Sequence, residues 1–225
     1  MTARARDCLA RVAAVRVLTP DVLEADLAMA DPPAMAFAAG QWVSVPFGPK
    51  TVRAYSIASS PLTPSRITLC ADVAPDGIGS RWFRALRPGD EIRFTGPLGG
   101  FVYSRADPRR PLFVAEEIGI VPIRSMLTEL YATGFGRPTA LVYQARDAGW
   151  LVYDRELRSL SRRYPGFAYH PAPAARAAEV VARLAPEPSG LVAYVAGGET
   201  TIRAVREILM GRGLDRKAVK WEKFW

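Results

Sequence analysis

Residues 111–144 read PLFVAEEIGIVPIRSMLTELYATGFGRPTALVYQ and mark a change in the pattern of the chain. Residues 111–115 form a continuous apolar run of strand length, and residues 139–144 form a second one. Between them, residues 122–133 have helical periodicity that ends near Gly134. Continuous apolar runs alternating with helices are typical of buried parallel strands in βαβ units. The segment therefore predicts an α/β domain, whose ligands bind at the carboxyl ends of the strands.

The alternation continues to the C-terminus, whereas the first hundred residues contain short strands between Pro and Gly clusters. In the second half we expect strands at 166–170, 190–196 and 219–224, and helices at 154–163, 174–184 and 200–211. In the first half we expect strands at 10–17, 22–27, 41–47, 54–58, 66–74 and 91–95, and one helix at 82–86. Short strands at this spacing favour an all-β barrel. We therefore predict a two-domain β + α/β chain: an antiparallel Greek-key β-barrel (residues 1–106), then a Rossmann-like α/β domain with a parallel sheet (residues 107–225).

Composition excludes several kinds of chemistry. The 225 residues include one histidine and two cysteines, which cannot build a metal site from several His or Cys ligands, nor a four-Cys iron–sulfur cluster. We therefore predict no metal ligands. His170 stands in Tyr-His-Pro, and the chain has no nucleophile elbow, so Ser-His-Asp hydrolysis is not expected.

The formal net charge of +8 is compatible with an acidic partner. It also fits an Arg-rich coding composition, because only four of the thirty basic residues are lysines. No run of five or more like charges appears, so nucleic-acid binding is not expected. No apolar signal core follows the N-terminal charges, and no apolar stretch approaches the ~20 residues that span a bilayer. We expect a cytoplasmic protein without a membrane span.

Two motifs in the first half suggest a phosphate-bearing ligand. In Arg53-Ala54-Tyr55-Ser56, alternation places Arg53 and Tyr55 on one face of a strand, where Arg suits phosphate and Tyr suits a planar ring. In residues 76–82, DGIGSRW, a Gly-Ser turn opens a short helix whose backbone N–H groups form an anion site. Each motif alone also has a structural interpretation, as an exposed strand face and as a helix N-cap by Ser80.

The order of the motifs is more specific. Gly40-Gln41 before an apolar strand, Arg-x-Tyr-Ser, Gly-x-Gly-Ser and Gly-Pro-x-Gly-x-Phe (residues 96–101), followed by an α/β domain, resembles the ferredoxin–NADP reductase superfamily over essentially the whole chain. The resemblance implies FAD in the barrel. It implies that Arg53 holds the pyrophosphate, that Tyr55 stacks on the flavin, and that Ser56 approaches flavin N5, which makes Tyr55 and Ser56 catalytic candidates. Further pyrophosphate contacts are implied for Gly77, Ile78, Gly79 and Ser80.

The second half resembles the family's nicotinamide domain, which implies NADH or NADPH, but it departs from the pattern. Gly119 and Pro122 match the usual Gly-Gly-Thr-Gly-x-x-Pro, whereas Glu116 and Glu117 stand where small residues normally let a dinucleotide approach the backbone. These acids are expected to repel a pyrophosphate. They also have a structural interpretation, as solvated charges or as complements to a helix dipole.

The later family motif, Cys-Gly-Pro-Pro, is matched here only by Gly197, and Glu199 adds a third acid. The tail resembles the family's Glu-x-aromatic ending, which implies that Glu222 and Phe224 are catalytic candidates and that Trp225 contacts the cofactor. Trp221 and Phe224 could instead be buried residues of an edge strand. Arg146 matches a family position near the nucleotide, although it could merely pair with Asp147 or Asp154.

The leading hypothesis is a flavoprotein oxidoreductase that passes electrons from NAD(P)H or another donor, via FAD, to a redox protein or small acceptor. A surplus of basic residues in the last 25 positions could steer an acidic ferredoxin- or flavodoxin-like partner, or could be a solvated helix face. An alternative is a flavin-binding electron-transfer subunit, or docking module for a partner subunit, that has lost nucleotide binding. A third possibility is a binding module without flavin.

Overall fold

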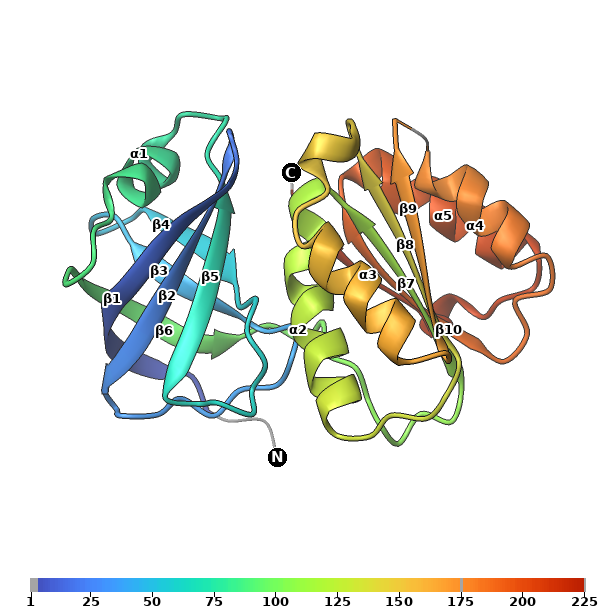
Figure 1. Ribbon diagram of the computed structural model, residues 1–225, viewed down its shortest axis with the longest axis horizontal. Coiled ribbons are helices and arrows are strands. Elements are labelled where there is room, and N and C mark those ends of the chain that lie inside the picture. Colours follow the sequence, from blue (N-terminus) through green and yellow to red (C-terminus); the bar gives the residue numbers. More distant parts are fainter. Residues whose placement is uncertain (1–3, 175, 225) are drawn as a thin grey trace. The chain divides into compact units, whose positions relative to one another are not determined.

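The computed structural model describes residues 4–174 and 176–224. The chain divides into two compact units, one of residues 1–103 with 121–133 and the other of residues 104–120 with 134–225. Figure 1 shows an antiparallel sheet in the first unit and a parallel sheet flanked by helices in the second. The predicted fold class is confirmed, whereas the exact boundary between residues 106 and 107 stays a prediction.

The first unit is a six-stranded antiparallel barrel. Its elements are β1 (Arg6–Thr19), β2 (Val22–Asp31), β3 (Trp42–Pro46), β4 (Val52–Ser56), β5 (Arg66–Asp72), α1 (Ile78–Ala85) and β6 (Glu91–Leu98). The strand order is β4-β3-β6-β1-β2-β5. Ile57, just beyond β4, forms a bridge with Leu69 of β5, so the two edges of the sheet meet. The inward positions of the strands and of α1 fill the barrel with apolar side chains, among them Leu27, Ile67, Phe83 and Phe94.

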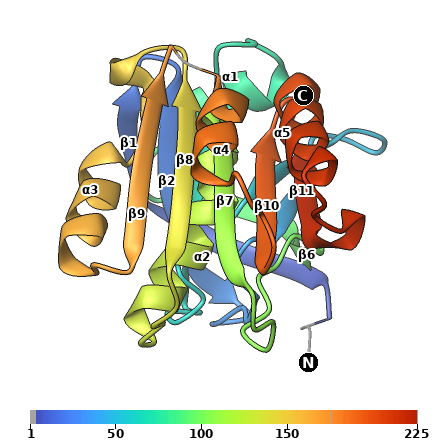
Figure 2. The same cartoon turned by 90° about the vertical axis from the view of Figure 1, so that its right-hand side faces the viewer.

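The second unit has a five-stranded parallel sheet. Its elements are β7 (Arg110–Glu116), η1 (Glu117–Gly119), β8 (Thr139–Ala145), η2 (Ala148–Trp150), α3 (Asp154–Arg163), β9 (Phe167–Pro173), α4 (Ala177–Leu184), β10 (Leu191–Gly197), α5 (Glu199–Gly211), η3 (Arg216–Ala218) and β11 (Val219–Lys223). Helix α2 (Ile120–Ala132) connects β7 to β8 and groups with the first unit from residue 121. Figures 1 and 2 show α3 on one face of the sheet and α4 and α5 on the other.

The strand order β11-β10-β7-β8-β9 determines where a ligand would bind in this unit. From β7 the chain proceeds to β8 and β9 on one side, and then crosses to β10 and β11 on the other. The carboxyl ends of β7 and β10 are therefore the topological switch point, where open α/β sheets bind their ligands.

The predicted strands and helices are all present, and the largest errors in the helix starts are those of α1 and α4. Helix α1 begins at Ile78 rather than at Trp82, because its first turn packs against β4 despite the glycine at position 79. Helix α4 begins at Ala177 rather than at residue 174, because Ala174 adopts a left-handed φ of 56° that ends β9 in a turn.

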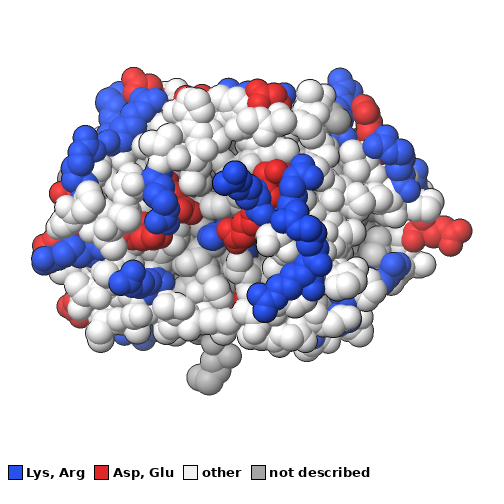
Figure 3. Space-filling view, viewed as in Figure 1, with Lys and Arg blue, Asp and Glu red and all other residues white. Residues whose placement is uncertain are grey.

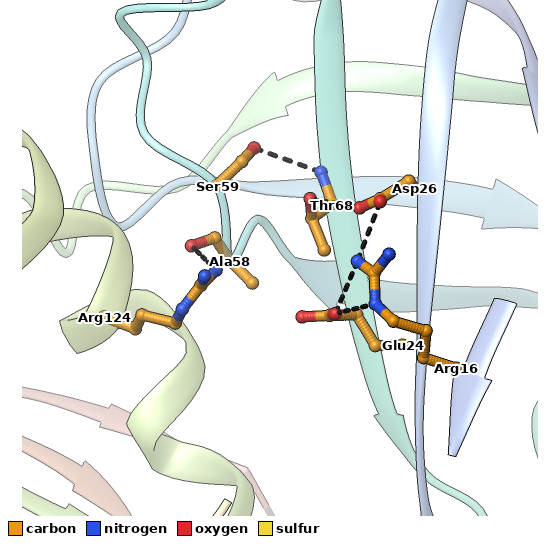
Figure 4. Close-up of polar contacts among 7 residues, drawn as sticks. All are labelled: Arg16, Glu24, Asp26, Ala58, Ser59, Thr68 and Arg124. Carbon is orange, nitrogen blue, oxygen red and sulfur yellow. Dashed lines mark hydrogen bonds and ion pairs between the residues drawn. The ribbon is translucent and has the colours of Figure 1, made fainter. Parts of the chain in front are cut away.

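Polar contacts fix the turn that follows β4 (Figure 4). The Arg124 guanidinium donates to the Ala58 carbonyl at 2.9 Å, and the backbone N–H of Thr68 donates to Ser59 Oγ at 3.0 Å. Ser125, which is fully buried, donates its hydroxyl to the Ser59 carbonyl at 2.6 Å. Helix α2 therefore holds the loop directly after the Arg53-Ala54-Tyr55-Ser56 motif.

Figure 4 also shows a charged network across β1, β2 and β5. Arg16 bridges Glu24 and Asp26, each at 2.7 Å, and Thr68 donates its hydroxyl to Asp26 at 2.7 Å. The Glu24 side chain is only 5% exposed, whereas that of Arg16 is 48% exposed. The Arg16 guanidinium thus compensates the charge of the nearly buried Glu24 carboxylate.

Two of the expected absences concern membrane spans and metal ligands. No helix there is long and apolar enough to cross a membrane. No group of three or more His, Cys, Asp or Glu side chains in that part of the chain is arranged to hold a metal ion. Cys8 and Cys70 are buried free thiols.

Candidate functional site

Strand β4 and the start of α1 lie against each other in the barrel. A Cβ atom added to Gly79 would be 2.8 Å from the Tyr55 hydroxyl oxygen and 3.1 Å from Arg53 Cγ. Real Cβ atoms do not make contacts as short as 2.8 Å, so only glycine fits at this position. The two motifs identified in the first half of the sequence are therefore brought together, with Arg53 and Tyr55 both facing the first turn of α1.

Tyr55 is held from several directions. Its hydroxyl donates to the Gly79 carbonyl at 3.3 Å, and its ring lies 5.6 Å from those of Trp82 and Phe83, centroid to centroid. The residue is 8% exposed, and burial raises the pKa of its phenol to about 12. Tyr55 therefore stays protonated and rigid at neutral pH.

Arg53 and Ser56 have polar groups that are free to meet a ligand. The Arg53 guanidinium donates to the carbonyl of Val52, and within the described part of the chain it forms no ion pair. Ser56 is 8% exposed, and among residues 4–174 and 176–224 its hydroxyl has no hydrogen-bond partner. A cation without an acidic partner suits an anionic ligand, and a free hydroxyl suits one that forms hydrogen bonds.

The N-terminus of α1 provides further donors. Gly77 is the N-cap and makes no side-chain cap, and it is exposed together with Ile78. The structural interpretation of Ser80 as the N-cap is wrong, because Ser80 lies inside the helix and is buried. The first N–H groups of a helix have no intrahelical partner and favour an anion. Together with the Arg53 guanidinium they fit a phosphate-bearing group.

In the second unit, the carboxyl edge of the sheet is linked by Glu116, the last residue of β7. Its Oε2 accepts a hydrogen bond from the backbone N–H of Gly198 at 2.8 Å, and its Oε1 accepts from Gln144 Nε2 at 2.9 Å. Gln144 Oε1 in turn accepts from the N–H of Ala177 at 2.6 Å. The interpretation of Glu116 as a solvated loop charge is therefore wrong: it satisfies the N-terminus of α5, not that of the helix that follows it.

Glu117 and Glu199 behave differently from Glu116. Glu117 adopts a left-handed φ of 48°, and its carboxylate accepts from the backbone N–H of Arg146 at 2.7 Å. Glu199 is 73% exposed and pairs with Lys223 at 2.8 Å, which lowers the pKa of its carboxyl. The structural interpretation, a charge at a helix start, is confirmed for Glu199.

Two glycines of the nicotinamide motifs, Gly119 and Gly197, lie at the same edge. A Cβ atom on Gly119 would lie 2.2 Å from the Ala196 carbonyl oxygen, and one on Gly197 would lie 2.7 Å from Glu116 Cβ. Pro122 occupies the first turn of α2, where its missing N–H costs nothing. Arg146 places its guanidinium 3.5 Å from the centre of the Trp150 ring, and Asp154 pairs with Arg158 instead.

Of the C-terminal candidates, Glu222 lies on β11, an edge strand, and Phe224 follows directly after it. Glu222 is paired in register with Ala196, and its Oε2 is buried and has no partner within the described residues. Burial raises the pKa of this carboxyl to about 7. Phe224 donates its backbone N–H to the Gly197 carbonyl. The alternative of a buried Trp221 is wrong, since it is 50% exposed, and Trp225 lies outside the described residues.

Sequence reasoning did not single out Gln144 or Trp82. Gln144 ends an apolar strand at the ligand-binding edge, a position that could have drawn attention to it. Trp82 was predicted only as the start of a helix, and its contact with Tyr55 depends on a barrel closure that no local pattern reveals.

The comparisons with known proteins agree with this arrangement. Residues 10–103 match the family described as "Oxidoreductase FAD-binding domain". The chain is 38% identical over 156 residues to ferredoxin–NADP reductase B of Sorangium cellulosum, covering 68% of this chain and 64% of that protein. It is 28% identical over 167 residues to the reductase component of propane 2-monooxygenase of Gordonia sp., covering 73% of this chain and 48% of that protein. The chain thus spans less than two thirds of the length of both relatives.

Solved structures share the fold. The cytochrome P450 reductase GcoB of Amycolatopsis superimposes with a TM-score of 0.88 at 24% identity, over 98% of this chain and 70% of that one. A ferredoxin NADP⁺ reductase of Neisseria gonorrhoeae, with bound FAD and NADP, superimposes with a TM-score of 0.83 at 18% identity, over 97% and 99% of the two chains. Residues 10–103 thus match the FAD-binding domain of an oxidoreductase family, and the chain is similar to a ferredoxin–NADP reductase and to the reductase component of a monooxygenase.

Proposed function

We propose that this protein is a flavin-dependent oxidoreductase that passes electrons from NAD(P)H or another donor, through FAD, to a redox protein or small acceptor. The observation that carries the proposal is the contact between β4 and α1, which places the unpaired Arg53 beside Gly79 in the first turn of a helix whose N-cap, Gly77, makes no side-chain cap. FAD, when bound, supplies the redox chemistry by accepting two electrons and releasing them singly or together.

Different residues of the barrel are then proposed to bind different parts of FAD. Arg53 and the first N–H groups of α1, at Gly77 and Ile78, bind the pyrophosphate. Tyr55, fixed by its neighbours and by the Gly79 carbonyl, forms a rigid wall for a planar ring. The Ser56 hydroxyl donates to or accepts from the edge of that ring. On the second unit, Glu222 is a candidate for holding a proton near neutral pH, because its pKa is raised.

The electron acceptor is proposed to be an acidic redox protein or a partner subunit. Figure 3 shows Lys and Arg side chains grouped over α3, whose exposed arginines are Arg155, Arg158, Arg162 and Arg163. The two curated relatives are a ferredoxin–NADP reductase and the reductase component of a monooxygenase. A cationic surface steers an acidic partner toward the protein. A cytoplasmic location remains a prediction.

A second function is favoured by one observation, the hydrogen bonds of Glu116 at the ligand-binding edge of the parallel sheet. In that case the chain is a flavin-binding electron-transfer subunit that does not use a nicotinamide nucleotide. Anaerobic mixing of the flavin-loaded protein with NADH or NADPH separates the two functions. Bleaching of the flavin absorbance identifies a nucleotide-dependent reductase, and no bleaching at millimolar nucleotide identifies the electron-transfer subunit.

Flavin binding itself is tested with Arg53→Ala. Removing a charge-assisted phosphate contact costs about 1.5–3 kcal/mol, so the variant is expected to lose FAD on dialysis that the wild-type protein retains. The matched control is Arg66→Ala, which removes an exposed arginine of β5 and is expected to leave FAD content unchanged. Full FAD occupancy of Arg53→Ala, or a wild-type protein that takes up no FAD, would contradict the proposal.

A further inference from the structure

The carboxyl ends of β7 and β10 form the switch point of the parallel sheet, and this edge already contains an anionic side chain. Glu116, at the end of β7, extends its side chain to the N–H of Gly198, directly after the neighbouring strand β10. Gly198 is the N-cap of α5 and makes no side-chain cap of its own. A backbone N–H at a helix start beside a switch point is the donor that the phosphates of a dinucleotide use in such domains.

We propose that Glu116 is a built-in anion that takes the place of a dinucleotide phosphate at this edge of the sheet, so that the chain binds free nicotinamide nucleotides weakly. This inference rests on the proposed function and concerns which molecule donates the electrons. It concerns the second unit alone, whereas flavin binding depends on the barrel.

The shape of the backbone supports a resident carboxylate. A Cβ atom on Gly197 would meet Glu116 Cβ at 2.7 Å and Glu116 Oε2 at 2.9 Å. The glycine at this position is therefore required by the Glu116 side chain that lies over it. In a dinucleotide-binding domain, a glycine of this kind makes room for the ligand instead.

The carboxylate is also held in place. Gln144 donates to Glu116 Oε1 at 2.9 Å, and Gln144 is itself fixed by the N–H of Ala177 at the start of α4. The neighbouring Glu117 accepts from the N–H of Arg146 at 2.7 Å. Both acids thus occupy backbone donors along one edge, and a dinucleotide must break these hydrogen bonds and tolerate two nearby negative charges.

ADP-ribose is a suitable probe, because it carries the adenosine, the diphosphate and the second ribose but has no nicotinamide to react with flavin. We would titrate it calorimetrically into the full-length, flavin-loaded protein and into Glu116→Gln and Glu116→Gly. The expected wild-type Kd is weaker than about 1 mM, and both variants are expected to bind at least about tenfold more tightly. The control Glu187→Gln, which neutralises an exposed acid in the loop after α4, is expected to match the wild-type protein.

Micromolar binding of ADP-ribose by the wild-type protein would overturn the proposal, as would variants that bind it no more tightly than the wild type. Glu116→Gln preserves the size of the side chain, so the test survives if Glu116→Gly does not fold. The flavin absorbance of the same samples reports FAD binding separately. A protein without flavin would contradict the proposed function, whereas tight ADP-ribose binding to a yellow protein would contradict only this inference.

Discussion

The close approach of Gly79 to Tyr55 allows the effect of Gly79→Ala on the free energy of unfolding to be predicted. Replacing glycine by alanine inside a helix normally stabilises it by up to about 1 kcal/mol. In Gly79→Ala, the new methyl group would lie 2.8 Å from the Tyr55 hydroxyl, and overpacking of this kind costs about 1–3 kcal/mol. The Tyr55 ring is packed against Trp82 and Phe83 and cannot easily move away. We therefore expect Gly79→Ala to lower the free energy of unfolding by about 1 kcal/mol.

The same substitution should have the opposite sign when the hydroxyl is removed. Tyr55→Phe alone loses one hydrogen bond of 3.3 Å, at a cost of about 1 kcal/mol. In that background the closest remaining contact of the new methyl group is Arg53 Cγ at 3.1 Å, part of an exposed and flexible side chain that can shift. Gly79→Ala should then stabilise the protein by up to about 1 kcal/mol, so the two positions are coupled by about 2 kcal/mol.

Urea unfolding of the wild-type protein, both single variants and the double variant measures this coupling. All four are compared at equal flavin content, because bound ligand shifts apparent stability. If Gly79→Ala changes the free energy of unfolding by the same amount in both backgrounds, the close approach of α1 to β4 is not what selects glycine at position 79. The basis for placing Arg53 beside the helix start would then be lost as well.

Three further predictions concern groups whose environments the structure defines. Burial raises the pKa of Glu222 to about 7 from an ordinary value of 4.5, so between these pH values the folded protein binds a proton that the unfolded chain has lost, and its stability should fall as pH rises. Glu222→Gln should therefore flatten a plot of melting temperature against pH over this range. An unchanged slope would contradict the raised pKa of Glu222. Arg16→Met removes a positive charge that compensates the nearly buried Glu24 carboxylate. Because Arg16 is half-exposed, we expect the free energy of unfolding in urea to fall by about 1–2 kcal/mol, and an unchanged value would show that water replaces the guanidinium fully. Ser125→Ala removes a buried hydrogen bond of 2.6 Å to the Ser59 carbonyl and should cost about 1–2 kcal/mol, measured in the same way; an unaltered stability would show that the loop after β4 does not need α2.

The architecture could be predicted from the sequence because periodicity is a local property. An apolar run such as Pro111–Ala115 is too short for a helix and is typical of a buried strand, and the observed strand β7 extends this run by one residue at each end. The start of α1 could not be predicted in this way, because Gly77 and Gly79 read as a turn. Helix propensity there is outweighed by packing against Tyr55, which lies 24 positions earlier in the chain.

The chemistry of the second unit was less accessible to sequence reasoning. Glu116 and Glu117 could be recognised as acids in a place where small residues are usual. That Glu116 binds the N–H of Gly198, 82 positions away, depends on β7 and β10 being neighbours in the sheet. A local pattern contains no information about such a pairing, so the sequence predicted repulsion of a pyrophosphate but not the hydrogen bond from Gly198 to Glu116.

Each unit has a helix N-terminus whose backbone N–H groups favour an anion, but the side chain beside it differs. In the barrel, the N-cap of α1 is Gly77, and the free N–H groups of this helix start lie beside Arg53, a cation without an acidic partner among the described residues. In the α/β unit, α5 begins at Gly198 with an N–H already bonded to Glu116. Because both helix starts attract anions equally by their backbone alone, the side chain next to each decides whether the anion is a ligand or part of the protein. Arg53 beside the start of α1 favours tight binding of a flavin nucleotide. Glu116 beside the start of α5 favours weak binding of a nicotinamide nucleotide, or none.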